Sequence, residues 1–352
     1  MKGEGQNCES ERGSLAAVRA VALLSGGLDS TLAAVLVKRA GIDVVGLYVR
    51  TLFGTNDGRE RYVASIAERI GISPRLLDLS EEQMERVRHP RHGYGAGVNP
   101  CIDCRILMLE AARRVMEEEG AQFVVTGEVL GQRPMSQHRR SLVLVAEESG
   151  LGDRLLRPLS ANCLSDTLPV RKGWIRRDHL LGLSGRSRHE QIALAARFGI
   201  TEYPQPAGGC LLLEKAFAAR LRDAFAHIGK DALTRDGFRL LRYGRQFRLS
   251  DRAKVIVGRN ERENEILSEF ATDRIAIEPH DVVGPLTLVE GSPSGDEVLL
   301  SACLAARYCD HDNVTVLSMR ISRSGEERIV EVVPLDSDDP RLTDWRIDRV
   351  TR

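Results

Sequence analysis

One short segment constrains the fold of this chain more than any other. An apolar stretch, Ala20–Leu24, runs directly into Ser25-Gly26-Gly27-Leu28-Asp29-Ser30, and a run rich in Ala, Leu and Val begins at Thr31. A buried strand that passes through a glycine turn into a helix is typical of a phosphate-binding loop. Glycines permit positive φ, and N–H groups, hydroxyls and the helix dipole face the anion. We therefore expect a phosphate or pyrophosphate to bind Ser25, Gly26, Gly27, Ser30 and Thr31.

The motif fits neither G-x-x-x-x-G-K-S/T nor G-x-G-x-x-G, which excludes the Walker loop and the dinucleotide fingerprint. Strand and helix patterns alternate downstream as far as Gly127, which predicts an α/β fold with a doubly wound parallel sheet. Ligands bind such sheets at the carboxyl ends of the strands. Residues 25–30, the loop 50–58 and Thr126-Gly127-Glu128 are expected to converge there.

The length of 352 residues predicts more than one domain. Residues 1–16 are polar and predict a flexible tail, and residues 17–235 form the α/β domain. From 236 to 352, short alternating runs such as Phe238–Leu241 and Gln246–Leu249 predict a smaller β-rich α+β domain. The polar segment from Ser80 to Pro100 is expected to be a functional loop.

The chain has no run of about 18 apolar residues and no signal peptide within residues 1–16, so we expect a cytoplasmic protein without membrane contact. Its seven cysteines then indicate reduced thiols or metal ligands. Because the formal net charge is zero, only local patches favour a nucleic-acid partner.

Three cysteines have a suggestive context: Cys101 and Cys104 form a C-x-x-C at a helix start, and Cys210 follows a Gly-Gly turn. One interpretation gives all three to a [4Fe–4S] cluster whose fourth iron binds hydrosulfide. A second makes Cys104 and Cys210 a persulfide redox pair. A structural zinc would need His92 or Cys163 as a fourth ligand. The fourth interpretation is that these are buried, inert thiols.

The motif at 25–30 resembles the PP-loop of ATP pyrophosphatases. Together with Asn99-Pro-Cys-Ile-Asp-Cys104, Thr126-Gly127-Glu128 and Gly208-Gly-Cys210 in that order, residues 18 to about 225 resemble the PP-loop tRNA thiouridine synthases. The resemblance implies a HUP-like fold that binds ATP with Mg²⁺ and adenylates a uridine oxygen, which sulfur then displaces. It implies catalytic roles for Asp29, Cys104 and Cys210, cluster ligation by Cys101, Cys104 and Cys210, and nucleotide contacts from Thr126 and Gly127.

The C-terminal region resembles the RNA-binding domain of NFACT proteins. The residues that carry this resemblance are Tyr243-Gly-Arg-Gln-Phe-Arg248, Lys254-Val-Ile-Val-Gly-Arg-Asn260, Gly284-Pro285 and Ala305-Ala-Arg-Tyr308. A cluster of basic side chains with two interleaved rings predicts an RNA-binding face; it comprises Arg242, Tyr243, Arg245, Phe247, Arg248, Arg252, Lys254 and Arg259. Between Arg133 and Glu190, eleven Lys and Arg against six Asp and Glu favour a second one.

These observations predict an ATP-dependent tRNA sulfurtransferase whose partners are tRNA and a sulfur donor, either free sulfide or a sulfur carrier. Whether the chain forms a homodimer stays open. Three alternatives also stay open: another PP-loop ligase acting on a small molecule, a non-catalytic nucleotide-sensing RNA-binding protein, and a zinc-stabilised fold without sulfur chemistry.

Overall fold

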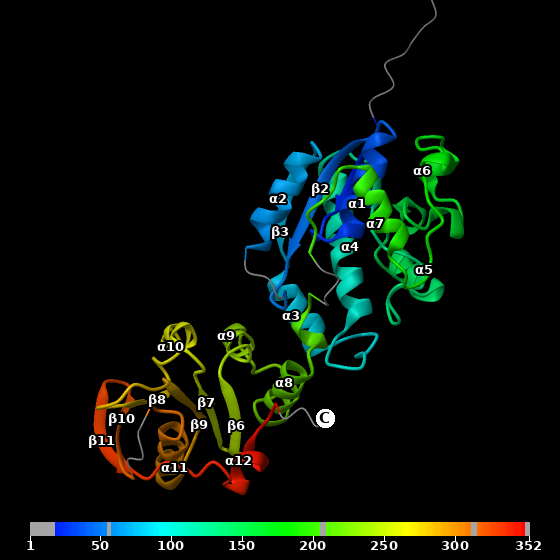
Figure 1. The fold of residues 1–352 in the computed structure, drawn as a ribbon. Helices are drawn as coiled ribbons and strands as arrows, with labels where there is room; N and C mark the ends of the chain where they lie inside the picture. The colour runs from blue at the N-terminus through cyan, green and yellow to red at the C-terminus, as the bar shows by residue number, and fades with distance from the viewer. Residues whose placement is uncertain (1–17, 55–57, 205–208, 311–314, 349–352) are drawn as a thin grey trace, which may run out of the picture. The chain divides into compact units, whose positions relative to one another are not determined.

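The computed structural model describes residues 18–54, 58–204, 209–310 and 315–348, which form two compact units (Figure 1). The first unit comprises residues up to 51, 56–80 and 101–207. The second comprises 52–55, 81–100 and the chain from 208 onward. The second unit therefore includes two segments that lie well before residue 236. The predicted tail at 1–16 falls outside the described residues.

The first unit is built on a five-stranded parallel sheet of order β3-β2-β1-β4-β5. Its strands are β1 (Arg19–Leu23), β2 (Asp43–Arg50), β3 (Ser73–Asp78), β4 (Phe123–Val125) and β5 (Leu155–Leu156). Strands β2 and β3 lie on one side of β1, and β4 and β5 lie on the other, so the strand order switches between β1 and β4. Doubly wound sheets bind ligands at the carboxyl ends of the two strands that flank such a switch. The predicted doubly wound α/β class is confirmed.

Helices cover both faces of this sheet (Figure 1). Ala20 and Ala22 of β1 pack with α1 (Leu28–Arg39), α2 (Arg59–Arg69) and α7 (His189–Arg197). The intervening Val21 packs on the opposite face with α4 (Cys101–Glu118) and α5 (Arg139–Glu148). The short helix α6 (Leu168–Arg171) completes the unit. Since successive strand residues point to opposite faces, a strand covered on both sides is apolar throughout, as Ala20–Leu24 is.

Two segments differ from the sequence prediction. The expected loop from Ser80 to Pro100 begins with helix α3 (Ser80–Arg88), because Met84 and Val87 are spaced three apart and both are buried. The run Phe238–Leu241, expected to be a strand, is in helix α9 (Arg235–Leu240) and its C-cap. Thr234 caps α9 by accepting a hydrogen bond from the Gly237 N–H at 3.1 Å. In both places helical periodicity and capping prevailed over local composition.

The second unit contains a six-stranded sheet of order β11-β10-β8-β9-β7-β6, in which all pairs are antiparallel. The predicted β-rich α+β class of this region is confirmed. The strands are β6 (Arg245–Ser250), β7 (Ala253–Val257), β8 (Ile275–Pro279), β9 (Thr287–Gly291), β10 (Leu317–Arg323) and β11 (Glu326–Val332).

Both faces of this sheet are also covered. Helix α11 (Gly295–Ala306) packs on one face, and α9 with α10 (Glu261–Ser268) packs on the other. A separate core, centred on Phe53 and Phe238, joins α3 and α9 to α8 (Lys215–His227). Helix α12 (Pro340–Trp345) returns the chain to β6, where Ile347 donates to the Gln246 carbonyl at 3.1 Å.

Candidate functional site

The loop between β1 and α1 is held open by one glycine. Gly26 has φ +73°, and a Cβ on it would lie 3.0 Å from Cγ2 of Val63. Gly27, which was also expected to need positive φ, has φ −86° and is the N-cap of α1. No side chain caps this helix. The first N–H groups of α1 therefore remain available to an anion at the positive end of the helix dipole.

The loop hydroxyls predicted to bind phosphate also shape the turn. Ser30 Oγ and Thr31 Oγ1 donate to the Gly27 carbonyl at 2.9 and 3.1 Å, and the Ser25 N–H donates to Ser30 Oγ at 3.2 Å. Ser30 and Thr31 are buried, whereas Ser25 is exposed. Of the three hydroxyls, that of Ser25 is the one best placed to turn toward a ligand.

Asp29 is anchored by two side chains that sequence reasoning did not connect to it. Its Oδ2 accepts hydrogen bonds from Gln132 Nε2 and Arg188 Nη2, both at 2.7 Å. Its Oδ1 is buried and has no hydrogen-bond partner among the described atoms. A buried carboxylate oxygen without a hydrogen bond costs about 1–3 kcal/mol of stability. A ligand that binds this oxygen would recover that free energy. A carboxylate oxygen of this kind is a suitable ligand for Mg²⁺.

The end of β4 lies directly against the first turn of α1. A Cβ on Gly127 would lie 2.4 Å from the Ser30 nitrogen and 2.5 Å from the Asp29 carbonyl carbon. Only glycine allows this approach, so the expected convergence of residues 25–30 with Thr126-Gly127 is confirmed. The Thr126 hydroxyl itself is buried and donates to Glu128 Oε2 at 3.1 Å.

Glu128 joins three elements through a buried ion pair network. Its carboxylate lies 3.2 Å from Arg105 Nε and 2.9 Å from Arg157 Nε, and its side chain is 2% exposed. Burial alone would raise the pKa of Glu128, but Arg105 and Arg157 hold that pKa below its ordinary value. Arg105 directly follows Cys104 on α4. The network therefore fixes the cysteine-bearing end of α4 against the segment that touches the phosphate loop.

Cys101 and Cys104 lie one helical turn apart at the start of α4, and both are half-buried. Arg133, an exposed residue of the same unit, is influenced by charges at this helix start and at the phosphate loop. Desolvation lowers the pKa of Arg133, and the charge of Arg105 lowers that pKa further. Cys101 and Asp29 shift the same pKa upward.

Cys210 belongs to the second unit, where it pairs with Gly54 in an isolated β-bridge. Its neighbour Leu211 donates to the Phe53 carbonyl at 2.9 Å. In the described part of the chain, no three His, Cys, Asp or Glu side chains are grouped in a way that would hold a metal ion. The support for a cluster held by three cysteines therefore comes from the order of the sequence motifs and not from the structure.

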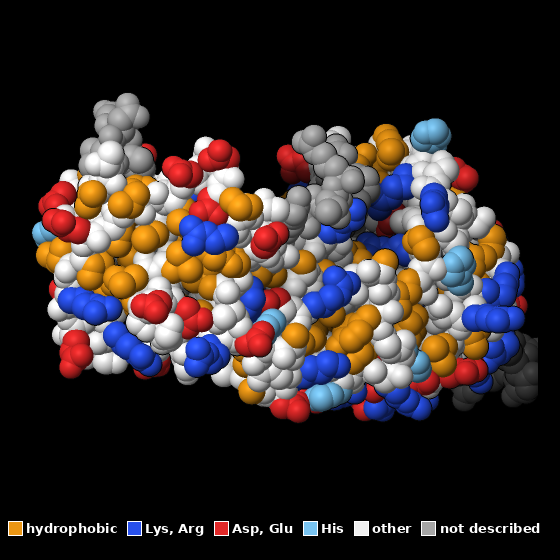
Figure 2. All heavy atoms as spheres, turned by 90° about the horizontal axis from the view of Figure 1, so that it is seen from below, with side chains coloured by type: hydrophobic (Ala, Val, Ile, Leu, Met, Phe, Trp, Pro, Cys, Tyr) orange, Lys and Arg blue, Asp and Glu red, His pale blue; other side chains and the backbone are white. Residues whose placement is uncertain are grey.

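The basic zone between Arg133 and Glu190 is partly neutralised by its own acids. Arg171, Arg176 and Arg177 each form an ion pair with an aspartate of the same zone. Arg157 is buried on Glu128, and Arg188 is bound to Asp29. Figure 2 shows Lys and Arg interspersed with Asp and Glu on the face seen there. The charge excess counted along the sequence overstates what a polyanion would meet.

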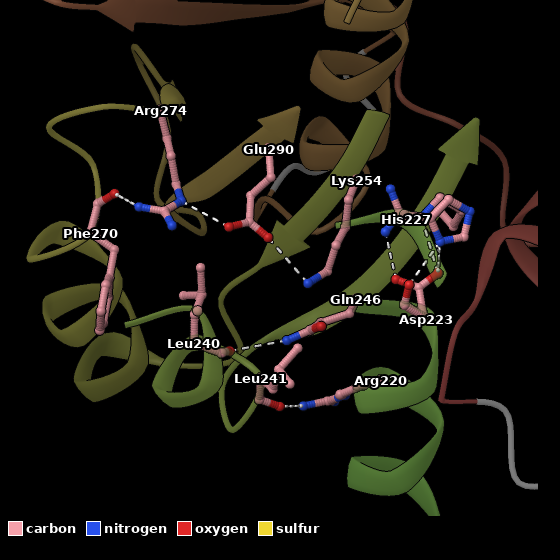
Figure 3. Close-up of polar contacts among 12 residues, drawn as sticks. Arg220, Asp223, His227, Leu240, Leu241, Gln246, Lys254, Phe270, Arg274 and Glu290 are labelled. Carbon is pink, nitrogen blue, oxygen red and sulfur yellow. Dashed lines mark hydrogen bonds and ion pairs between the residues drawn. The ribbon is translucent and has the colours of Figure 1, made fainter. Parts of the chain in front are cut away.

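The predicted RNA-binding face on β6 and β7 is wrong for three of its members. Phe247 is 1% exposed and lies in the core beneath α11. Lys254 is 2% exposed and donates to Glu290 at 3.1 Å, and Arg274 donates to the same carboxylate at 2.9 Å (Figure 3). Arg248 is held by Asp223 through bonds of 3.0 and 2.6 Å. Both faces of this sheet are covered, so strand alternation gives these side chains no exposed side.

The Gly258-Arg259-Asn260 motif also has a structural role. The Asn260 side chain caps α10 by accepting from the Glu263 N–H at 3.0 Å. Glu263 Oε2 accepts from the backbone N–H groups of Gly244 and Arg259, both at 3.1 Å. A Cβ on Gly258 would lie 2.0 Å from Asn264 Oδ1. The motif therefore ties the end of β7 to the start of β6, although Arg259 and Asn260 both remain exposed.

Among the described residues, no helix is long and apolar enough to cross a bilayer. Residues 16–162 match the family described as thiamine biosynthesis protein (ThiI). Residues 244–346 match the family described as NFACT protein RNA binding domain.

Two curated relatives resemble part of the chain. The tRNA-specific 2-thiouridylase MnmA of Xanthobacter autotrophicus is 34% identical over 155 residues, which cover 39% of this chain and 39% of the relative. A probable tRNA sulfurtransferase of Thermococcus kodakarensis is 30% identical over 149 residues, which cover 40% of this chain and 36% of the relative. The chain thus spans about two fifths of the length of these relatives.

Among solved structures, a 4-thiouridine synthetase in complex with RNA and bound ATP has 22% identity and a TM-score of 0.37, and the match covers 52% of this chain and 41% of that one. The two resemblances inferred from the motifs are confirmed: residues 16–162 are similar to the ThiI family of PP-loop proteins, and residues 244–346 to the RNA-binding domain of NFACT proteins.

Proposed function

We propose that this chain is an ATP-dependent tRNA sulfurtransferase, which replaces a uridine carbonyl oxygen with sulfur through an adenylated uridine. The observation that carries the proposal is the 3.2 Å ion pair between Arg105 and Glu128, which joins the start of α4, where Cys101 and Cys104 lie, to the segment that packs on the phosphate loop. A nucleotide site and a pair of thiols thus lie in one unit, as the two halves of such a reaction require. The similarity of residues 16–162 to the ThiI family supports the same assignment.

In the first half-reaction, the uridine oxygen attacks the α-phosphorus of ATP and the bond to pyrophosphate breaks. The uncapped N–H groups of α1 would receive the pyrophosphate, with Ser25 beside them. Arg188 has a buried Nε without a hydrogen-bond acceptor among the described atoms, so it has a donor to spare for an anion. Preorganised donors of this kind stabilise the charge that develops on a leaving group.

Mg²⁺ fits beside Asp29, whose buried Oδ1 is unpaired. When bound there, the ion would neutralise charge on the phosphates. Arg188 and Gln132 keep Asp29 in place by occupying its other oxygen. We therefore assign Asp29 to loop and metal positioning, and Gln132 and Arg188 to its support.

In the second half-reaction, a sulfur nucleophile attacks the activated ring carbon, and AMP leaves with the former uridine oxygen. We propose that Cys101, Cys104 and Cys210 handle this sulfur, which free sulfide or a sulfur carrier would supply. The motif order supports two chemistries: a [4Fe–4S] cluster on all three cysteines, which would bind free sulfide, and a persulfide relay between Cys104 and Cys210, which would receive its outer sulfur from a persulfide-bearing carrier. We further assign ATP chemistry to residues 17–235 and RNA binding to residues 236–352.

The function can be tested with purified full-length chain, tRNA, ATP, Mg²⁺ and sulfide under anaerobic conditions. We expect thionucleosides in the digested tRNA by mass spectrometry, together with ATP-dependent pyrophosphate release that requires tRNA. Asp29→Asn should abolish both, whereas Asp43→Asn, which changes an exposed carboxylate paired with Arg19, should leave both intact. Pyrophosphate release with a small molecule in place of tRNA, and no thionucleoside, would contradict the proposal.

The cluster has its own test. Anaerobically purified protein is expected to contain about four iron and four sulfide ions per chain and to lose both when Cys101, Cys104 or Cys210 is changed to Ala. Cys303→Ala is the matched control, because Cys303 lies on α11 at the edge of the second unit's core. Full thiolation activity by an iron-free preparation would rule out the cluster, and if that activity required a persulfide-bearing carrier in place of sulfide it would favour the persulfide relay.

A further inference from the structure

Two arginines from distant parts of the sequence meet at one aromatic ring of the second unit. The guanidinium carbon of Arg245, on β6, lies 4.6 Å from the centroid of the Tyr308 ring. That of Arg307, at the end of α11, lies 5.5 Å from the same centroid. Cations at these distances are attracted to the negative face of the ring. Tyr308 therefore orients both guanidinium groups.

The fold leaves these two positive charges without a carboxylate partner among the described residues. Arg245 donates a hydrogen bond to the Gly258 carbonyl at 3.0 Å, and Arg307 donates one to the Leu335 carbonyl at 3.3 Å. Arg307 Nε is buried and has no acceptor among the described atoms. Each guanidinium has five donors, so most remain for a ligand. Arg248, by contrast, forms an ion pair with Asp223.

The backbone around Tyr308 is tightly packed, which fixes the position of the ring. The Tyr308 N–H donates to the Ala305 carbonyl at 2.9 Å. A Cβ on Gly284 would lie 2.5 Å from Cys309 Sγ, so the neighbouring loop passes very close to this turn. The Phe247 ring also packs against Tyr308, with the two ring centroids 6.4 Å apart. Preorganised donors lose little entropy when they bind.

We propose that Arg245, Arg307 and Tyr308 form a clamp for a phosphodiester group of the tRNA backbone. A guanidinium stacked on an aromatic ring keeps its planar fork free to bind phosphate bidentately, and a tyrosine ring can also stack on an exposed base. The inference rests on the proposed function, and it revises the predicted face on β6 and β7, from which burial removes Phe247 and Lys254. Arg245 belongs to that predicted cluster, whereas Arg307 and Tyr308 directly follow α11.

The test measures tRNA binding to the full-length chain by fluorescence anisotropy over a salt series. In Arg245→Gln/Arg307→Gln, we expect affinity to fall about tenfold for each arginine. The slope of log K against log salt should become shallower by about 1.4–1.8, since each lost phosphate contact removes about 0.7–0.9 from it. Arg323→Gln/Arg328→Gln removes the same charge from exposed positions on β10 and β11 and should change neither value by more than a small amount.

Two further variants separate binding from folding. Arg307→Gln alone removes one weak backbone bond and one ring contact, so it should fold normally and show about half of the change in slope of the double variant. Arg245→Lys keeps the charge but not the fork, and should lie between wild type and Arg245→Gln. Wild-type affinity and slope in the double variant, or an equal loss in the control pair, would overturn the clamp without touching the proposed function. Absence of tRNA binding by the unmodified chain would overturn both.

Discussion

At the scale of single residues, sequence could identify the loop but not the partners of its key side chain. Asp29 stands within a recognisable motif, whereas Gln132 and Arg188 are more than one hundred positions away along the chain. Their contact depends on how loops converge at the carboxyl ends of β1 and β4. Glu128 was visible in the sequence as part of Thr126-Gly127-Glu128, but nothing local indicated that Arg105 and Arg157 would bury it.

Glu128 gives a prediction for stability. Glu128→Gln should destabilise the first unit by about 3–5 kcal/mol, because it leaves two arginines of the network without their counter-charge. Since the pKa of Glu128 is lowered in the folded state, its contribution is present above the unfolded pKa and is lost as the pH falls through the folded pKa. Urea unfolding at several pH values should therefore show a weaker acid dependence in the variant.

The control is Glu60→Gln, which removes an exposed carboxylate paired with Arg50. That pair lies at the surface, so the expected loss is below about 1 kcal/mol. Equal stability of Glu128→Gln and wild type at pH 7 would mean that the network contributes nothing to the fold.

At the scale of elements, periodicity predicted the alternating strands and helices as far as β4, but it did not predict β5, and it misjudged exposure in the second unit. Lys254 and Phe247 lie on β7 and β6, whose two faces are both covered by helices. A charged residue in a short strand normally indicates a solvent-facing side. Lys254 is buried because Glu290, on the adjacent strand β9, supplies its counter-charge (Figure 3). That pairing requires the strand order β7-β9, which sequence does not specify.

The close approach of β4 to α1 gives a prediction at this scale. Gly127→Ala should shift the first turn of α1, since the new Cβ would meet backbone atoms that cannot rotate away. We expect a loss of about 1–3 kcal/mol in stability and a larger loss of ATP-dependent pyrophosphate release. Gly295→Ala is the control, because a Cβ there meets nothing within 4 Å. If both variants bind and turn over ATP like wild type, the approach is not needed for the site.

At the scale of the whole molecule, the two units are expected to divide the work. Asp29→Asn alters a loop of the first unit, while the proposed clamp lies in the second. We expect Asp29→Asn to lower pyrophosphate release by about 10²–10³-fold and to leave tRNA affinity within a factor of two. The clamp variant should do the reverse, raising the KM for tRNA while kcat at saturating tRNA stays the same. Steady-state kinetics and anisotropy on the same preparations check both.

The interleaving of the two units has a consequence for synthesis. Phe53, Met84 and Val87 are fully buried in the second unit, yet their partners on α8 and α9 follow residue 208. A ribosome adds about 5–20 residues per second, so these side chains wait on the order of ten seconds for the chain that covers them. Until then, the nascent protein exposes apolar residues of the second unit that interrupt the first unit along the chain. The yield of the protein in cells should therefore depend on chaperones that shield such segments.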